Sequence, residues 1–218
     1  GKTKTIAVDL TGLVAGDDCR VRIVTSMEIY WDAAFFSVDE EPAPIELREL
    51  PLVSADLHFR GYSRRVPHAQ HGPEFYDYAR VSTETRWPPL EGHYTRYGDV
   101  LPLLSESDDR LVVLAQGDEM SLEFAAPQEN PPAGWKRDFL LYNVGWDKDA
   151  DLNTVYGQSV EPLPFRAMER YPFPEGVTSP DNPAYQEYLQ QYQTRATSQQ
   201  RFWKRICRFE RDGSGARE

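Results

Sequence analysis

The sequence predicts a mainly β protein: an antiparallel β-sandwich of jelly-roll type with long loops and a C-terminal helix. Short apolar alternations separated by turn residues fill the first half of the chain, and a hairpin signal returns near its middle. Helical periodicity is clear only near the C-terminus. With 218 residues, 40% of them hydrophobic, the chain can bury a full core as one large domain.

Alternating apolar residues predict the first strands. Ile6, Val8 and Leu10 share one face of a strand. Val21 and Ile23 share one face of the next. Later segments carry the same signal, with apolar residues at Ile45, Leu47, Leu52, Leu57 and Phe59. The N-terminal part of the chain therefore contributes several strands to the expected sandwich.

The strongest hairpin signal lies in the second half. Apolar runs at residues 111–114 and 120–124 flank a turn over residues 116–118, whose glycine supplies the positive φ that a tight turn needs. The apolar run of residues 139–144 predicts a central strand that is buried on both faces. We assign three tryptophans beside apolar runs to the core: Trp31, Trp135 and Trp146.

The C-terminal part is rich in proline and then becomes helical. Each proline fixes φ and removes a backbone donor, which predicts an extended surface segment. Asn182 can cap a helix that starts with Pro183. Apolar residues then recur at helical spacing: Tyr185, Tyr188, Leu189 and Tyr192. We therefore expect a β-sandwich domain over residues 1–178, an extension with a packed helix over residues 179–211, and a disordered tail over residues 212–218.

Charge narrows the possible partners. The net charge of −11 argues against nucleic acid and anionic lipid, because both attract clustered Lys and Arg. No apolar segment approaches the roughly 20 residues that span a bilayer, so we expect no membrane insertion. The chain begins with Gly1 rather than methionine, which we interpret as a piece of a longer precursor or a processed chain.

Two cysteines, Cys19 and Cys207, lie near opposite ends of the chain. They form either one disulfide that joins the two ends or two separate thiols, and their spacing is compatible with both. A disulfide would indicate an oxidising compartment.

The stretch GWDKDADLNT, residues 145–154, carries oxygen-bearing side chains at alternate positions of a predicted loop. They are Asp147, Asp149, Asp151 and Asn153. Calcium takes six to eight oxygen ligands, so such a loop can wrap around one ion and predicts a calcium site. The loop is not an EF-hand, because Leu152 and Gln158 stand where that motif requires Gly and Glu. A solvated acidic turn closed by Asx interactions is the alternative.

The histidines suggest a different kind of metal site. His68 and His71 can place two imidazoles near one zinc or copper ion. Further ligands would come from nearby side chains: His58, Asp56 or Asp77. This pattern supports a metal-dependent enzyme as an alternative function, although the sequence contains none of the common hydrolase, phosphate-binding or metalloprotease motifs.

Five segments have a recognisable wording: RVRIVTSMEIYWDAAF, LPLVSADLHFRGYSR, HYTRYGDVLPLL, DDRLVVLAQGDEMSLEF and RDFLLYNVGWDKDADLNTVYGQSVEPLPF. Over most of residues 3–195 they resemble the C-terminal domain of large bacterial secreted proteins that carry FG-GAP/VCBS propeller repeats, of the ASPIC/UnbV type. The resemblance implies a secreted or periplasmic chain attached to a β-propeller of the same precursor, and it implies no reaction. Family-like versions carry a glycine in the acidic loop where this chain has Ala150.

The segment over residues 63–98 is rich in Pro, Gly, Arg and aromatic residues without clear periodicity. Long ordered loops of this kind often carry function, because a rigid scaffold holds them over a site. Aromatic faces and forked guanidinium groups suit sugars or carboxylate-bearing partners. The residues expected to contact a ligand are Trp87, Tyr94, Tyr97, Arg86 and Arg96. The alternative is a loop whose aromatic rings cap one end of the core.

Two classes of function follow from these patterns. The sequence favours a non-catalytic accessory or binding domain that recognises a glycan, a peptide or the neighbouring propeller domain. The alternative is a metal-dependent enzyme that uses His68, His71 and nearby carboxylates. Elemental analysis separates the two classes, since stoichiometric zinc, copper or iron would favour the enzyme.

Overall fold

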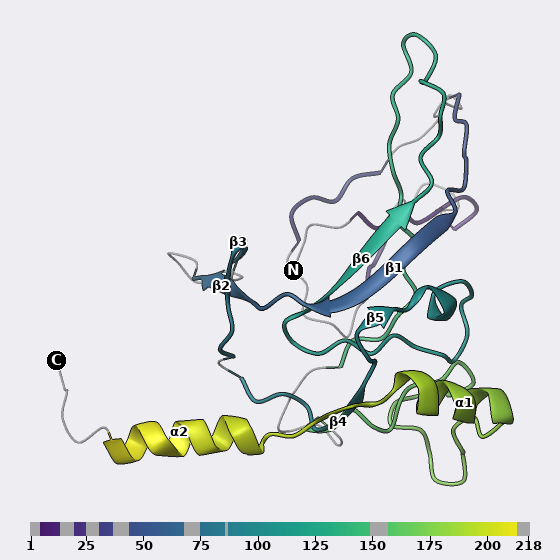
Figure 1. Ribbon diagram of the computed structural model, residues 1–218. Coiled ribbons are helices and arrows are strands. Elements are labelled where there is room, and N and C mark those ends of the chain that lie inside the picture. The colour runs from purple at the N-terminus through teal and green to yellow at the C-terminus, as the bar shows by residue number, and fades with distance from the viewer. Residues whose placement is uncertain are drawn as a thin grey trace. The chain divides into compact units, whose positions relative to one another are not determined.

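The computed structural model (Figure 1) describes residues 5–13, 20–24, 31–36, 44–67, 75–85, 87–148 and 157–212. The chain divides into two compact units, Gly1–Arg48 and Glu49–Glu218. In the described part of the first unit there is no helix or strand, so the strands expected around Ile6, Val21 and Ile45 are wrong. A strand needs a neighbour for its backbone hydrogen bonds, and alternation alone does not supply one.

The second unit is mainly sheet, as expected, with few helices. Its strands are β1 (Leu52–Phe59), β2 (Tyr62–Val66), β3 (Phe75–Ser82), β4 (Gly92–Tyr94), β5 (Gly98–Asp99), β6 (Asp118–Phe124) and β7 (Arg195–Thr197). Its helices are a 3-10 turn at Leu101–Leu103, α1 (Pro183–Tyr192) and α2 (Gln200–Asp212). The strands form three antiparallel sheets, in the orders β5-β1-β6, β2-β3 and β4-β7.

The β5-β1-β6 sheet covers the main apolar cluster and confirms the expected strands at β1 and β6. Ala55 and Leu57 alternate with polar residues along β1 and are buried against Val100. Leu57 pairs with Met120 of β6, which packs on the same cluster. Because successive side chains of a strand point to opposite faces, Asp56 and the other residues between the buried positions lie on the outward face.

Helix α1 confirms the prediction from the sequence, including its first residue. The side-chain oxygen of Asn182 accepts a hydrogen bond from the Tyr185 N–H at 3.0 Å, and Pro183 occupies the first turn. The tyrosines at helical spacing, Tyr185, Tyr188 and Tyr192, are buried against Leu103. The tyrosine stripe is therefore a packing face, which agrees with the periodicity in the sequence.

Residues 111–114 were expected to form the first strand of a hairpin with β6, but they form no strand. Other groups take their backbone hydrogen bonds. The Val113 N–H donates to the Thr95 hydroxyl at 2.7 Å, and the Thr95 N–H donates to the Val113 carbonyl at 3.1 Å. The Tyr188 hydroxyl donates to the Leu111 carbonyl at 2.7 Å. The expected turn does form, with Gly117 at φ +85°, and β6 pairs with β1 instead.

The central strand expected at residues 139–144 is also wrong. These residues form no strand, and Leu140 is 91% exposed. The three tryptophans assigned to the core are exposed as well: Trp31, Trp135 and Trp146. An apolar run forms a buried strand only where it can pair with a neighbouring strand. In the described residues the sheet that contains β1 has β5 and β6 as its edge strands, and residues 139–144 pair with neither.

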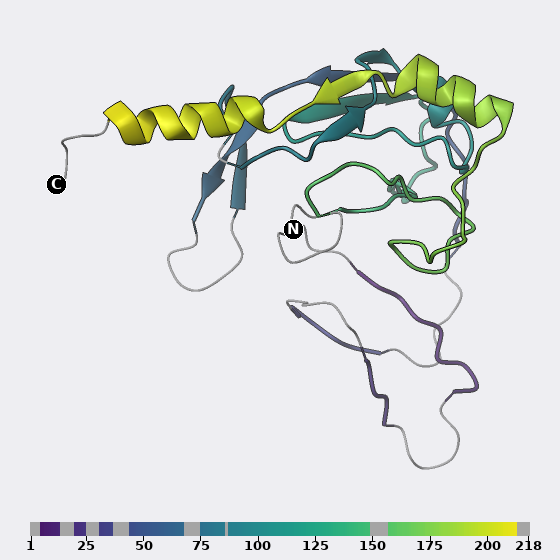
Figure 2. The same cartoon turned by 90° about the horizontal axis from the view of Figure 1, so that it is seen from below.

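The segment expected to be a long loop over residues 63–98 contains strands β2 to β5. The hairpin of β2 and β3 has few buried residues, and helix α2 was not predicted. In both views the hairpin and α2 lie toward the same end of the β5-β1-β6 sheet, the end at which β1 finishes (Figures 1 and 2). Across the described residues, no helix combines the length and apolar character needed to cross a bilayer.

Candidate ligand-binding surface

Asp118, the first residue of β6, organises a hydrogen-bond network. Its side chain is 1% exposed. One carboxylate oxygen accepts from the Tyr97 hydroxyl at 2.9 Å. The other accepts from Arg195 Nη2 at 2.5 Å and from the Ala115 N–H at 2.6 Å. The buried charge is therefore paired and hydrogen-bonded, as a charge without water must be.

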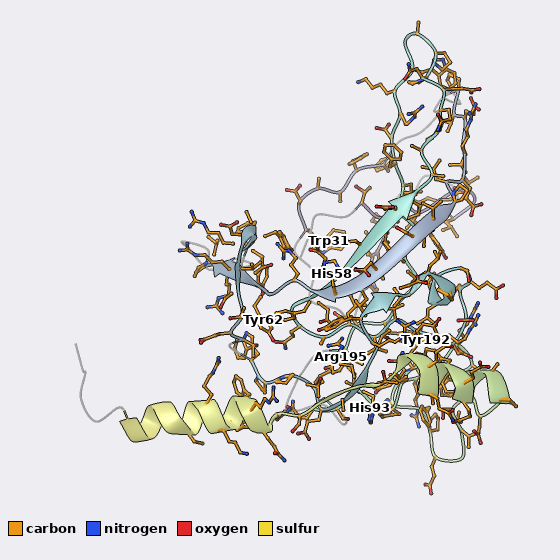
Figure 3. All side chains as sticks on the ribbon, in the orientation of Figure 1. Trp31, His58, Tyr62, His93, Tyr192 and Arg195 are labelled. Carbon is orange, nitrogen blue, oxygen red and sulfur yellow. The ribbon has the colours of Figure 1, made fainter. Side chains whose placement is uncertain are left out.

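Arg195 on β7 completes this network from the C-terminal part of the chain (Figure 3). Its Nε donates to the Thr95 carbonyl at 3.0 Å. Its guanidinium carbon lies 4.3 Å from the centre of the Tyr97 ring and 5.2 Å from that of Tyr94. A guanidinium group held against aromatic faces gains cation–π attraction while it stays paired with Asp118.

The surroundings of Asp118 change the pKa of nearby tyrosines. Burial, followed by the hydrogen bond and the negative charge of Asp118, raises the pKa of Tyr97 to about 12. Burial also raises the pKa of Tyr94 to about 12, although the positive charge of Arg195 opposes the shift. The pKa of Tyr62 is raised as well, by burial and then by the negative charge of Asp118, although the positive charge of Arg205 opposes the shift. These hydroxyls therefore stay protonated and can donate hydrogen bonds.

Thr85 connects the backbone of Trp87 to the turn of residues 115–118. The Trp87 ring is exposed, with 62% of the residue accessible. The Thr85 hydroxyl lies 2.8 Å from the Trp87 carbonyl oxygen, 3.2 Å from its nitrogen and 3.2 Å from Gln116 Oε1. Gln116 belongs to the turn that ends at Asp118, whose N–H donates to the Ala115 carbonyl at 3.1 Å. Side-chain bonds thus connect both Trp87 and Tyr97 to the turn of residues 115–118.

The other residues expected to bind a ligand have different positions. Tyr94 is 3% exposed and its hydroxyl donates to the Leu90 carbonyl, so its ring belongs to the core. The Arg96 guanidinium lies 4.7 Å from the centre of the Tyr192 ring, against helix α1. Arg86 lies outside the described residues. Of the five, Trp87 and the 40% exposed Tyr97 offer exposed aromatic rings.

The β2-β3 hairpin adds further exposed rings. Tyr76 and Tyr78 occupy alternate positions of β3, and their ring centres are 6.5 Å apart. The Arg60 guanidinium lies 5.9 Å from the centre of the Tyr78 ring. The hairpin adjoins the turn, because the Arg60 and Gly61 N–H groups both donate to the Gly117 carbonyl, at 2.9 and 3.0 Å.

Helix α2 borders the same region. Arg205 Nη2 donates to the Thr85 carbonyl at 2.5 Å, and its Nη1 lies 3.5 Å from Glu84 Oε2. The exposed Trp203 ring packs edge-on against Phe202, with ring centres 5.1 Å apart. We call the following residues the aromatic–arginine surface: the rings of Tyr76, Tyr78, Trp87, Tyr97 and Trp203, and the cations Arg60, Arg80, Arg201 and Lys204.

The outward face of the β5-β1-β6 sheet is a second polar region. His58 Nδ1 lies 3.0 Å from Asp56 Oδ2, and His58 Nε2 lies 3.4 Å from Glu119 Oε1. Glu119 also pairs with Arg60 at 2.9 Å. Asp56 could orient the imidazole as a general base, but its second nitrogen faces a carboxylate instead of an open position.

The predicted metal sites lie mostly beyond the part of the chain that the structure describes. Asp147 is exposed, whereas Asp149, Asp151 and Asn153 are outside the described residues, as are His68 and His71. Within the described residues no group of three His, Cys, Asp or Glu side chains is arranged to hold an ion. The calcium loop and the histidine site therefore stay predictions. Cys207 carries a free, exposed thiol, and Cys19 is outside the described residues.

No protein-family model, curated protein or solved structure matches this chain. The resemblance to the propeller-associated domain therefore stays a prediction. The sequence nominated Trp87 and Tyr97 through their aromatic character, but it gave no sign of the pairing between Asp118 and Arg195. These two residues lie 77 positions apart, and only the folded chain shows that they pair.

Proposed function

We propose that the domain is a non-catalytic binding module that recognises a glycan or a peptide through Trp87 and Tyr97. One observation carries the proposal: the hydroxyl of Tyr97 is hydrogen-bonded to the turn of residues 115–118, and the backbone of the exposed Trp87 is connected to the same turn through Thr85. A ring fixed before the ligand arrives loses little conformational entropy on binding, which favours stacking against a sugar or a side chain.

The test compares Trp87→Ala with Trp135→Ala on a glycan and peptide array. Trp135 is also exposed but lies outside the aromatic–arginine surface, so its removal controls for the loss of any surface tryptophan. We expect Trp87→Ala to weaken binding at least tenfold, as stacking losses of about 1.5 kcal/mol imply, and Trp135→Ala to leave it unchanged. Circular dichroism establishes that both variants are folded. Equal binding by both variants would contradict the proposal.

The proposed setting rests on the resemblance in the sequence. We propose that the domain is exported, completes a jelly-roll sandwich and accompanies a β-propeller of the same precursor. In that setting it would present its ligand site beside the propeller. An experimental structure of the longer protein tests this arrangement, and a chain without a neighbouring propeller would contradict it.

A further inference from the structure

The run of residues 139–144, FLLYNV, is exposed along its whole length although it contains no charged residue. Leu140 is 91% exposed and Tyr142 is 86% exposed. Five of the six side chains are large and apolar: Phe139, Leu140, Leu141, Tyr142 and Val144. Single exposed apolar residues are common on protein surfaces, whereas several large ones in succession indicate an interaction surface.

The backbone of this run has no partner within the described part of the chain. Residues 139–144 form neither a strand nor a turn there, and they make no hydrogen bond to another described residue. Their composition nevertheless favours a strand, because aromatic and β-branched side chains fit a pleated surface and no proline or glycine interrupts them. A neighbouring strand would satisfy the backbone groups and cover the apolar side chains at once.

The charges on the two sides of the run have opposite signs. Residues 136–138, before it, read KRD and have a net charge of +1, whereas residues 147–151, after it, read DKDAD and have a net charge of −2. Arg137 donates to the Glu129 carbonyl at 2.5 Å, a neutral group that leaves the positive charge of Arg137 in place. Two copies of the run in antiparallel alignment would therefore bring opposite charges together at both ends, whereas parallel alignment would bring like charges together.

We propose that residues 137–147 pair with the same residues of a second copy as antiparallel strands, so that the chain forms a two-fold symmetric dimer. A two-fold axis beside Tyr142 places Leu140 opposite Val144 of the second copy. The same register places Arg137 opposite Asp147 of the second copy. One face of the paired strands is then apolar along the whole run. The run is separate from the aromatic–arginine surface, so the dimer goes beyond the proposed binding function.

A second copy of the run fits better than the edge of β6, which in the described residues pairs with β1 alone. Strand β6 contains Asp118, Glu119 and Glu123 and no basic residue, so it offers no cation to the acidic residues that follow the run. The run itself supplies Arg137 for this purpose. A dimer therefore matches both the apolar side chains and the charges at their ends.

The size of the interface predicts its affinity. Covering the apolar side chains of the run would remove up to roughly 600 Å² of accessible surface from water on each copy. A standard interface buries about 800 Å² per partner, so we expect a dissociation constant in the micromolar range. One alignment opposes the pairing, Lys136 with Lys148, although the Lys148 ammonium group donates to the Val160 carbonyl of its own chain at 3.0 Å.

The first experiment measures the mass of the full chain by sedimentation equilibrium across the micromolar range. A chelator is present, because Asp147 also belongs to the predicted calcium loop. We expect the mass to rise with concentration from 25.1 kDa toward twice that value. Leu140→Lys puts a charge near the centre of the pairing and should weaken dimerisation at least tenfold. Leu47→Lys is the matched control, because Leu47 is 87% exposed and lies outside the run, and it should leave dimerisation unchanged.

A charge swap tests the antiparallel register. Arg137→Asp and Asp147→Arg each create two like-charged pairs in the dimer and should weaken it about fivefold, the size expected for two exposed ion pairs. The double variant Arg137→Asp/Asp147→Arg restores opposite charges and keeps the net charge of the parent, so its dissociation constant should return to within about twofold of the parent value. Circular dichroism shows whether each variant is folded, and a misfolded Leu140→Lys is replaced by Leu140→Ser.

Hydrogen exchange of the amides of residues 139–144 identifies what covers the run. Their protection should rise with protein concentration and should be lost in Leu140→Lys. Protection that does not depend on concentration would show that another segment of the same chain covers the run, and would overturn the inference. A chain that stays monomeric at all concentrations, equal weakening by Leu140→Lys and Leu47→Lys, or no recovery in the charge-swapped double variant would overturn it as well.

Discussion

The aromatic–arginine surface and the outward face of the β5-β1-β6 sheet are both polar and exposed, but they use their charges differently. On the sheet, His58 contacts two carboxylates, and Ser54 donates to Glu123 at 3.0 Å, so neighbouring side chains satisfy one another. Around the turn of residues 115–118, backbone groups and buried partners take the hydrogen bonds, while the Trp87 ring stays exposed and Tyr97 stays partly exposed. Surface side chains stay available to a ligand when buried residues and backbone groups, rather than neighbouring surface side chains, hold them in place.

The largest effect is expected from breaking the support of the aromatic–arginine surface. Arg195→Met keeps most of the side-chain volume but leaves the Asp118 carboxylate buried with one partner fewer. We expect the free energy of unfolding to fall by about 3 kcal/mol, because removing one member of a buried ion pair leaves the charge of the other buried without compensation. Urea unfolding measures the loss. Arg170→Met should stay within about 0.5 kcal/mol, and a similar small change for Arg195→Met would contradict the pairing.

A pH titration sharpens the same comparison. The pKa of Tyr94 and Tyr97 is raised to about 12 in the folded chain, from an ordinary value of 10.0. Their contribution to stability is fully present below pH 10 and is lost as pH rises from 10 to 12, because the unfolded chain releases these protons first. Urea unfolding between these pH values should show a falling free energy. Tyr97→Phe should fall less steeply, and a slope equal to that of the parent would contradict the raised pKa.

The smallest effect is expected on the outward face of the sheet. His58→Gln removes the contacts with Asp56 and Glu119, but these groups are largely exposed to water. We expect a loss of less than about 1 kcal/mol in the free energy of unfolding at neutral pH, the usual size for exposed ion pairs. Thermal or urea unfolding beside the parent chain measures it. A loss comparable to that of Arg195→Met would show that the two regions do not differ as described.

Parts of this structure could be predicted from local sequence alone. The cap of Asn182 and the tyrosine periodicity specified α1, because both the start signal and the packing face lie within one segment. The buried positions of β1 followed its alternation. The run at residues 139–144 misled, since whether a run becomes a strand depends on neighbours that lie far away in sequence.

The candidate site divides in the same way. Trp87 and Tyr97 could be nominated from residue type, because exposed aromatic residues beside arginines favour binding wherever they occur. Their support could not be predicted. Asp118 was expected only as part of a turn, and nothing in the local sequence around Arg195 indicates its pairing with a carboxylate 77 residues earlier.

The hydrogen bonds of the Gly117 carbonyl couple the motions of several segments of the second unit. This carbonyl accepts the N–H groups of Arg60 and Gly61, while the next residue holds Tyr97 and Arg195. Opening this turn would therefore release the hairpin, the tyrosine and β7 in one event. Amide protons on segments far apart in sequence would then exchange with solvent at a common rate, and a ligand bound across the surface would slow all of them together.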